Sequence, residues 1–167
     1  MIIGPESTGK STLTRQLAAH FGTSYADEFA RFYLEGLGRP YEQADLSRMA
    51  GGQIREEDLA AINAVNGLVF LDTDLYVIKV WSEDKYGTCA EGILQQIALR
   101  AYDLYLLTDI DMPWEDDPLR EHGTPEERRY FFNIYHDIVQ QSGVPFAVVR
   151  GSEAERLQQA IAAVQQL

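Results

Sequence analysis

Short segments with strand character alternate along the chain with longer segments in which apolar residues recur every three or four positions. The strand segments are 1–3, 23–25, 68–71, 104–107 and 146–149. The helical segments are 10–21, 29–66 with a break near 36–40, 92–101, 125–142 and 154–166. Apolar runs without polar alternation are typical of parallel strands buried on both faces. The pattern predicts one α/β domain over residues 1–167, with a five-stranded parallel sheet and helices on both of its faces.

Composition narrows the partners of this domain. The 167 residues suffice for one hydrophobic core, and the net charge is -12. Such a surface repels nucleic acid and anionic membranes, so we expect neither as a partner. No apolar run approaches the roughly 20 residues of a membrane span. Cys89 is the only cysteine, which excludes an intrachain disulfide, and we expect a cytoplasmic protein. The oligomeric state stays open.

The strongest chemical signal is the segment Gly4-Pro5-Glu6-Ser7-Thr8-Gly9-Lys10-Ser11. Its glycines let the backbone curl so that N–H groups surround a phosphate, while Lys10 reaches the β and γ phosphates and Ser11 ligates Mg²⁺. A strand precedes the segment and a helix follows it, as a P-loop requires. We therefore expect ATP and Mg²⁺ as cofactors. The predicted nucleotide-binding residues are Gly4, Glu6, Ser7, Thr8, Gly9, Lys10, Ser11, Thr12 and, beside the adenine, Arg150.

Acidic residues follow two of the predicted strands, at the sheet edge where ligands bind in open α/β folds. Asp72 is predicted to hold the magnesium shell, with a helix N-cap as the alternative. Asp27 and Glu28 end the second strand, and Arg31 follows one helical turn later. A carboxylate there is a candidate base for an acceptor hydroxyl, and the alternative is a plain ion pair. Asp74 is a second candidate base, and the sequence does not choose between it and Glu28.

The long acidic loop 108–120 is predicted to act as a lid, because a kinase must keep water from the phosphoryl group. Arg120, Arg128 and Arg129 are the cations available to meet transferring phosphate, although each is also able to form ordinary ion pairs. The predicted catalytic residues are Lys10, Glu28, Asp72, Asp74 and Arg120. The predicted acceptor-binding residues are Asp27, Glu28, Arg31, Asp74, Tyr76 and Trp81, of which the two aromatic residues are candidates to stack on a flat ring.

The motifs together resemble the NadR-type ribosylnicotinamide kinase domain of the P-loop NTPase superfamily. The resemblance rests on the segments 4–13, 27–31, 70–74, 79–81 and 105–120, which keep the family's order. It implies a fold like that of nucleoside and nucleotide kinases, and ATP-dependent phosphorylation of the 5′-hydroxyl of nicotinamide riboside for NAD synthesis. By position, Asp72 or Asp74 would serve Mg²⁺ and the acceptor hydroxyl, Glu28 and Arg31 would line the acceptor side, and Arg120 would belong to the lid.

Other functions stay open at this point. One alternative is a kinase whose acceptor is another nucleoside or a nucleotide. A second alternative is a regulatory ATP-binding or ATPase module whose nucleotide-bound state is recognised by a partner protein. The His-x-x-His signature of nucleotidyltransferases is absent from the sequence, so this segment is not expected to transfer adenylate.

Overall fold

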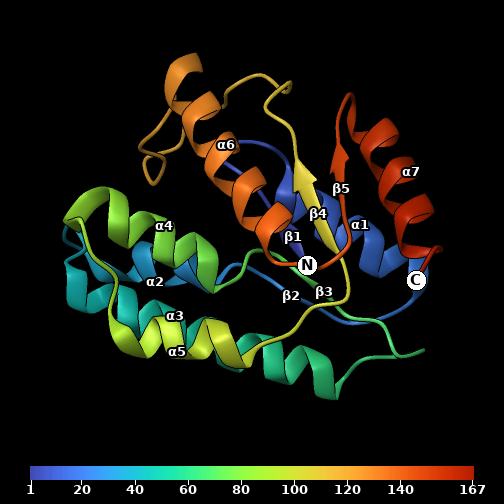
Figure 1. Ribbon diagram of the computed structural model, residues 1–167, viewed down its shortest axis with the longest axis horizontal. Helices are drawn as coiled ribbons and strands as arrows, with labels where there is room; N and C mark the ends of the chain where they lie inside the picture. The colour runs from blue at the N-terminus through green and yellow to red at the C-terminus, as the bar shows by residue number, and fades with distance from the viewer.

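The computed structural model describes residues 1–167 and contains helices alternating with short strands (Figure 1). The strands are β1 (Ile2–Ile3), β2 (Tyr25–Ala26), β3 (Phe70–Leu71), β4 (Tyr105–Thr108) and β5 (Phe146–Val149). The helices are α1 (Lys10–Phe21), α2 (Phe29–Leu37), α3 (Gln43–Ile62), α4 (Leu75–Tyr86), α5 (Glu91–Leu99), α6 (Pro125–Gln141) and α7 (Glu153–Val164). Each of the five predicted strand segments overlaps an observed strand, the second of them at Tyr25 alone, and the α/β prediction is confirmed.

The prediction of one continuous five-stranded sheet was wrong. The main sheet has three parallel strands in the order β1-β4-β5, and β2 and β3 form a separate parallel pair. A single bridge between Ile2 and Asp72 joins the two parts, together with the hydrogen bond from the Thr73 N–H to the Ile2 carbonyl at 3.0 Å. The physical reason lies in the residues after β3. Ile2 pairs with Asp72, but the next residue, Thr73, has φ 65° and leaves the extended conformation, so no ladder between β1 and β3 develops.

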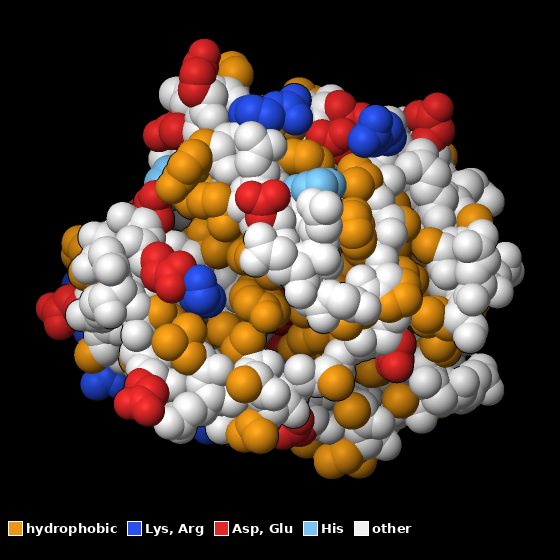
Figure 2. Space-filling view, viewed as in Figure 1, with side chains coloured by type: hydrophobic (Ala, Val, Ile, Leu, Met, Phe, Trp, Pro, Cys, Tyr) orange, Lys and Arg blue, Asp and Glu red, His pale blue; other side chains and the backbone are white.

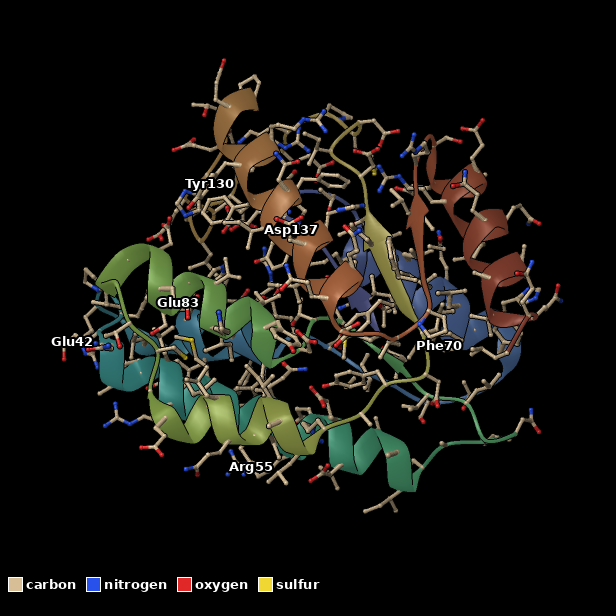
Figure 3. All side chains as sticks on the ribbon, viewed as in Figure 1. Glu42, Arg55, Phe70, Glu83, Tyr130 and Asp137 are labelled. Atoms are coloured by element: carbon tan, nitrogen blue, oxygen red, sulfur yellow. The ribbon has the colours of Figure 1, made fainter.

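Helices cover both faces of the strands, as predicted. On one face, α1 and α7 pack through Leu13, Leu17 and Ile161 against apolar strand side chains that include Phe70, labelled in Figure 3. On the other face, α3, α4 and α6 pack against β1, β3 and β4, and Tyr135 is one of the residues they bury. A third cluster joins α2, α3, α4 and α5 without any strand. The sheet therefore lies between two helical layers and a helical lobe extends one side (Figure 1).

The surface carries both apolar and acidic side chains. Figure 2 shows apolar side chains gathered in the middle of the face that carries α4, α5 and α6, with acidic side chains spread around its edge. None of the helices combines the length and the apolar character that crossing a membrane requires.

Candidate functional site

The segment between β1 and α1 forms a curled loop at the carboxyl end of the sheet. Its backbone is left-handed at Ser7 (φ 55°) and Gly9 (φ 76°), and Gly4 has φ 149°. A Cβ on Gly4 would lie 2.3 Å from the Thr108 Oγ1, so only glycine fits there. The Thr8 hydroxyl donates to the Pro5 carbonyl at 2.7 Å and lies 2.7 Å from the Thr108 hydroxyl. These contacts fix the loop in the shape of a phosphate cradle at the N-terminus of α1.

A cavity of about 200 Å³ opens beside this loop. Its walls come from the loop and the start of α1, from α2, α4, α6 and α7, and from the segment between β4 and α6. Of the residues predicted from the sequence, it brings together Gly4, Glu6, Ser7, Thr8, Gly9, Lys10, Ser11, Thr12, Glu28, Arg31, Trp81 and Arg120. The cavity therefore joins the phosphate cradle to an acidic and aromatic wall. A second, more apolar cavity beside Met1 and Leu104, at the amino ends of the strands, shares no residue with it.

Asp72 lies buried behind the cradle. Its side chain is 1% exposed, and neither carboxylate oxygen has a hydrogen-bond partner. Burial raises the pKa of Asp72 above its ordinary value, while the Lys10 ammonium and the Ser11 hydroxyl favour the charged form. Buried carboxylate oxygens without hydrogen-bond partners are costly, so this carboxylate is suited to bind a cation or a water molecule that a cation holds.

Glu28 stands at the start of α2 on the cavity wall. Its half-buried position raises the pKa of the carboxyl above its ordinary value; Lys10 and Arg31 oppose the rise, and Asp72 adds to it. A carboxyl poised in this way is able to accept a proton near neutral pH.

Asp74 has different neighbours from Asp72. Thr73, a β-branched residue with φ 65°, turns the chain between them. Asp74 then serves as the N-cap of α4, accepting from the Tyr76 N–H at 2.9 Å and from the Tyr105 hydroxyl at 3.1 Å. Burial raises the pKa of Asp74 to about 7. The structure places this carboxylate in the core and not on the cavity wall.

Three more predicted residues do not line the cavity. Asp27 is exposed and pairs with Arg15 at 2.7 Å. Tyr76 packs against the core cluster between α4 and the sheet. Arg150 is largely exposed, and its guanidinium lies 3.4 Å from the Asp109 carboxylate. Asp27 thus forms its ion pair with Arg15 and not with Arg31 at the helix start, and Tyr76 does not line the cavity.

The segment between β4 and α6 rests against the phosphate loop. The Glu6 carboxylate accepts from the backbone N–H groups of Glu121 and His122, at 3.0 and 3.1 Å. The Ser7 hydroxyl accepts from the Arg120 guanidinium at 3.2 Å. On the other side of the cavity, Arg31 and Asp117 form an ion pair at 2.6 Å. The segment therefore borders the cavity and contacts both the phosphate loop and α2.

Several cavity residues were missed by the sequence analysis. Val77 and Trp81 are four residues apart on α4 and share one face of the helix. Given Trp81, this spacing could have indicated Val77 as a cavity residue, whereas Tyr76 was predicted. Leu34, Tyr135 and Glu153 also line the cavity, but they come from three different helices, and no local pattern marks them.

The fold and this loop define the chain as a P-loop nucleotide-binding protein of the kinase-like α/β class. The chain belongs to the AAA domain family AAA_28, whose sequence profile matches residues 1–156.

Known proteins agree with this assignment. The chain is 29% identical to the trifunctional NAD biosynthesis/regulator protein NadR of Salmonella typhimurium, over 91% of this chain and 38% of NadR. For NadR of Escherichia coli the identity is 30%, over 89% and 37%. The chain thus spans less than half the length of these curated relatives. The similarity to NadR-type proteins predicted from the motifs is confirmed.

Solved structures extend the comparison. NadR protein in complex with NR matches with a TM-score of 0.80 and 26% identity, over 99% of this chain and 50% of that one. NadR protein in complex with NAD and AMP-PNP matches with a TM-score of 0.76 and 27% identity, over 99% and 48%. YorR protein from Bacillus subtilis, solved with phosphorylated GDP, matches with a TM-score of 0.56 and 14% identity, which shows a shared fold alone.

Proposed function

We propose that the protein is a kinase that transfers the γ-phosphoryl group of ATP to the 5′-hydroxyl of nicotinamide riboside, giving nicotinamide mononucleotide for NAD synthesis. The observation that carries the proposal is the shared cavity. Glu28 and Trp81 stand on the wall that faces the phosphate loop, at the place where a nucleoside hydroxyl would approach a γ-phosphate. The NadR structures with NR and with AMP-PNP support the choice of both substrates.

The proposed step needs a base, a phosphate clamp and shielding from water. The acceptor oxygen attacks the γ-phosphorus, the bond to the β,γ-bridging oxygen breaks, and the hydroxyl proton passes to the Glu28 carboxylate. Lys10 and Arg120 neutralise charge that develops on the transferring group. The segment between β4 and α6 excludes water, since water would otherwise accept the phosphoryl group. Arg31 holds the acceptor side while it is tied to that segment through Asp117.

Ser11 and Asp72 would hold Mg²⁺. Asp72 fits this role because both of its oxygens are buried without a partner beside the Ser11 hydroxyl. When bound, the ion would neutralise the phosphate charges of ATP. No group of three or more His, Cys, Asp and Glu side chains converges anywhere in the structure, this site included.

The aromatic wall is suited to a flat ring. Trp81 lines the main cavity and also two smaller hollows. One hollow holds Glu6, Asp84 and Glu121 against the single lysine Lys85, so carboxylates outnumber ammonium groups there, and the other holds Glu6 and Arg128. A positively charged pyridinium ring is favoured by an aromatic face and by carboxylates near it. This surrounding favours nicotinamide riboside over neutral nucleosides as the acceptor.

The test is to mix the purified protein with Mg-ATP and single nucleosides, including nicotinamide riboside, adenosine, cytidine and uridine, and to follow ADP release. Nicotinamide riboside is expected to stimulate ADP release strongly, with nicotinamide mononucleotide identified by mass spectrometry. If another nucleoside alone stimulates ADP release, the protein is a kinase, but its acceptor is that nucleoside and not nicotinamide riboside. Bound ATP with no stimulation by any acceptor would refute the kinase and favour a regulatory nucleotide-binding module.

A further inference from the structure

Arg156 lies buried behind the phosphate loop, although about 150 residues separate the two in sequence. The side chain, on the first turn of α7, is only 2% exposed. Its guanidinium donates to the carbonyls of Thr8 at 2.8 Å, Asp109 at 2.9 Å and Gly151 at 2.9 Å. It also forms an ion pair with Asp111. These partners belong to the three segments that follow β1, β4 and β5, so one side chain connects all three.

The phosphate loop needs a donor of this kind. When its N–H groups turn inward toward a phosphate, its carbonyl groups turn outward, and a buried carbonyl without a donor is costly. Thr8 is 1% exposed, so water does not reach it freely. Arginine suits the position because its planar fork presents several donors in fixed directions, whereas lysine presents one point charge.

The surroundings hold the Arg156 side chain in place. α7 begins with a capping box in which Ser152 and Glu155 bond each other's backbone N–H groups, and this fixes the helical register of the next residue. The Asp111 carboxylate that pairs with Arg156 also accepts from the Gly151 N–H at 2.6 Å. Arg156, Asp111 and Gly151 therefore form a closed set of contacts that does not depend on the phosphate loop.

We propose that Arg156 is a positioning residue for nucleotide binding. It keeps the phosphate loop in the shape that receives the phosphates, by bonding the loop to the segments after β4 and β5. The inference rests on the proposed binding of ATP at this loop, and it does not depend on which acceptor the kinase uses. Arg156 itself lies outside the cavity and does not touch the reacting atoms.

The experiment compares Arg156→Gln, Arg156→Lys and Arg100→Gln with the wild type. ATP affinity is measured by calorimetry with Mg-ATP and no acceptor, and stability by thermal unfolding. Arg100→Gln is the matched control, since Arg100 bonds Glu57 at 2.8 Å beside the second cavity at the amino ends of the strands. Arg156→Gln is expected to weaken ATP binding by roughly 10- to 100-fold, the range for lost charge-assisted hydrogen bonds, and Arg156→Lys by less. Arg100→Gln is expected to lower the melting temperature and leave the ATP affinity unchanged.

A folded Arg156→Gln protein with wild-type ATP affinity would overturn the proposal. Equal losses of affinity in Arg156→Gln and Arg100→Gln would also overturn it, because the effect would then follow general stability. If Arg156→Gln does not fold, Arg156→Lys decides the matter, and unchanged affinity in that variant refutes the role. Failure of every acceptor in the turnover assay would remove the kinase proposal while this binding comparison still stands.

Discussion

Two neighbouring glycines of α3 differ in the space around them, one being tightly packed and the other open. This difference allows a sharp test of the packing beside Glu28, the proposed base. An ideal Cβ on Gly52 would lie 2.0 Å from Cε1 of the Phe29 ring, whereas a Cβ on Gly51 would meet no atom within 4 Å. The Phe29 N–H also donates to the Gln53 side chain at 2.9 Å, so the start of α2 is fixed against α3 at this point. Glu28 is the residue directly before Phe29.

The size of the effect follows from two terms. Alanine in place of a helical glycine stabilises a protein by about 0.5–1 kcal/mol, and both variants receive this gain. Gly52→Ala also forces the Phe29 ring to move, and overpacking of this kind costs about 1–3 kcal/mol. The difference between Gly51→Ala and Gly52→Ala therefore isolates the overpacking cost. For a domain of this size it corresponds to a difference of about 2 to 12 °C in melting temperature.

The assay is urea unfolding followed by circular dichroism. The free energies of unfolding of the three proteins are obtained from their midpoints with one shared m-value. Gly51→Ala is expected to be more stable than the wild type, and Gly52→Ala less stable than Gly51→Ala by the amount above. Turnover with Mg-ATP and nicotinamide riboside is expected to fall in Gly52→Ala alone, because displacing Phe29 displaces Glu28. Equal stability of the two variants would refute the reasoning, since the ring would then have room that the structure does not give it.

Three further predictions concern single side chains. Lys10→Ala is expected to lower kcat/KM at least about 100-fold without changing the urea midpoint, and retained turnover would contradict the assignment of the loop. Glu28→Gln is expected to lower kcat by about 100- to 10,000-fold, because it removes the proposed base. Asp74→Asn is expected to leave kcat near the wild-type value, since asparagine also serves as an N-cap. A large loss of kcat in Asp74→Asn and not in Glu28→Gln would identify Asp74 as the base. The hydrogen bond from Arg39 is the main cause that lowers the pKa of Asp45 below its ordinary value. A lowered folded pKa stabilises the protein at pH values above about 4, and this contribution disappears as the pH falls through the folded value. The stability advantage of the wild type over Asp45→Asn is therefore expected to shrink on acidification in urea titrations at pH 7, 5 and 3, and a constant difference would contradict it.

Much of the fold could be predicted from the sequence, because the signals are local. The helix of residues 10–21 begins and ends as its periodicity and the following glycine indicate. The spacing of Gly4, Gly9 and Lys10 was enough to place the phosphate loop, since the loop closes within one short segment. The division of the sheet was not predictable in this way, because it depends on how β1 shares its two edges between β3 and β4.

The site shows the same division between local and distant information. From the sequence, Glu28 and Asp74 were equal candidates, since both follow a strand. The tertiary structure gives them different surroundings, because Asp74 bonds Tyr105 in the core while Glu28 lines the cavity together with Lys10. Arg156 carried no signal at all in the sequence, and its partner Thr8 lies near the other end of the chain. Short-range periodicity and turn chemistry determine helices, strands and the phosphate loop; only packing decides which distant side chains meet, because that choice depends on the positions of all the elements at once.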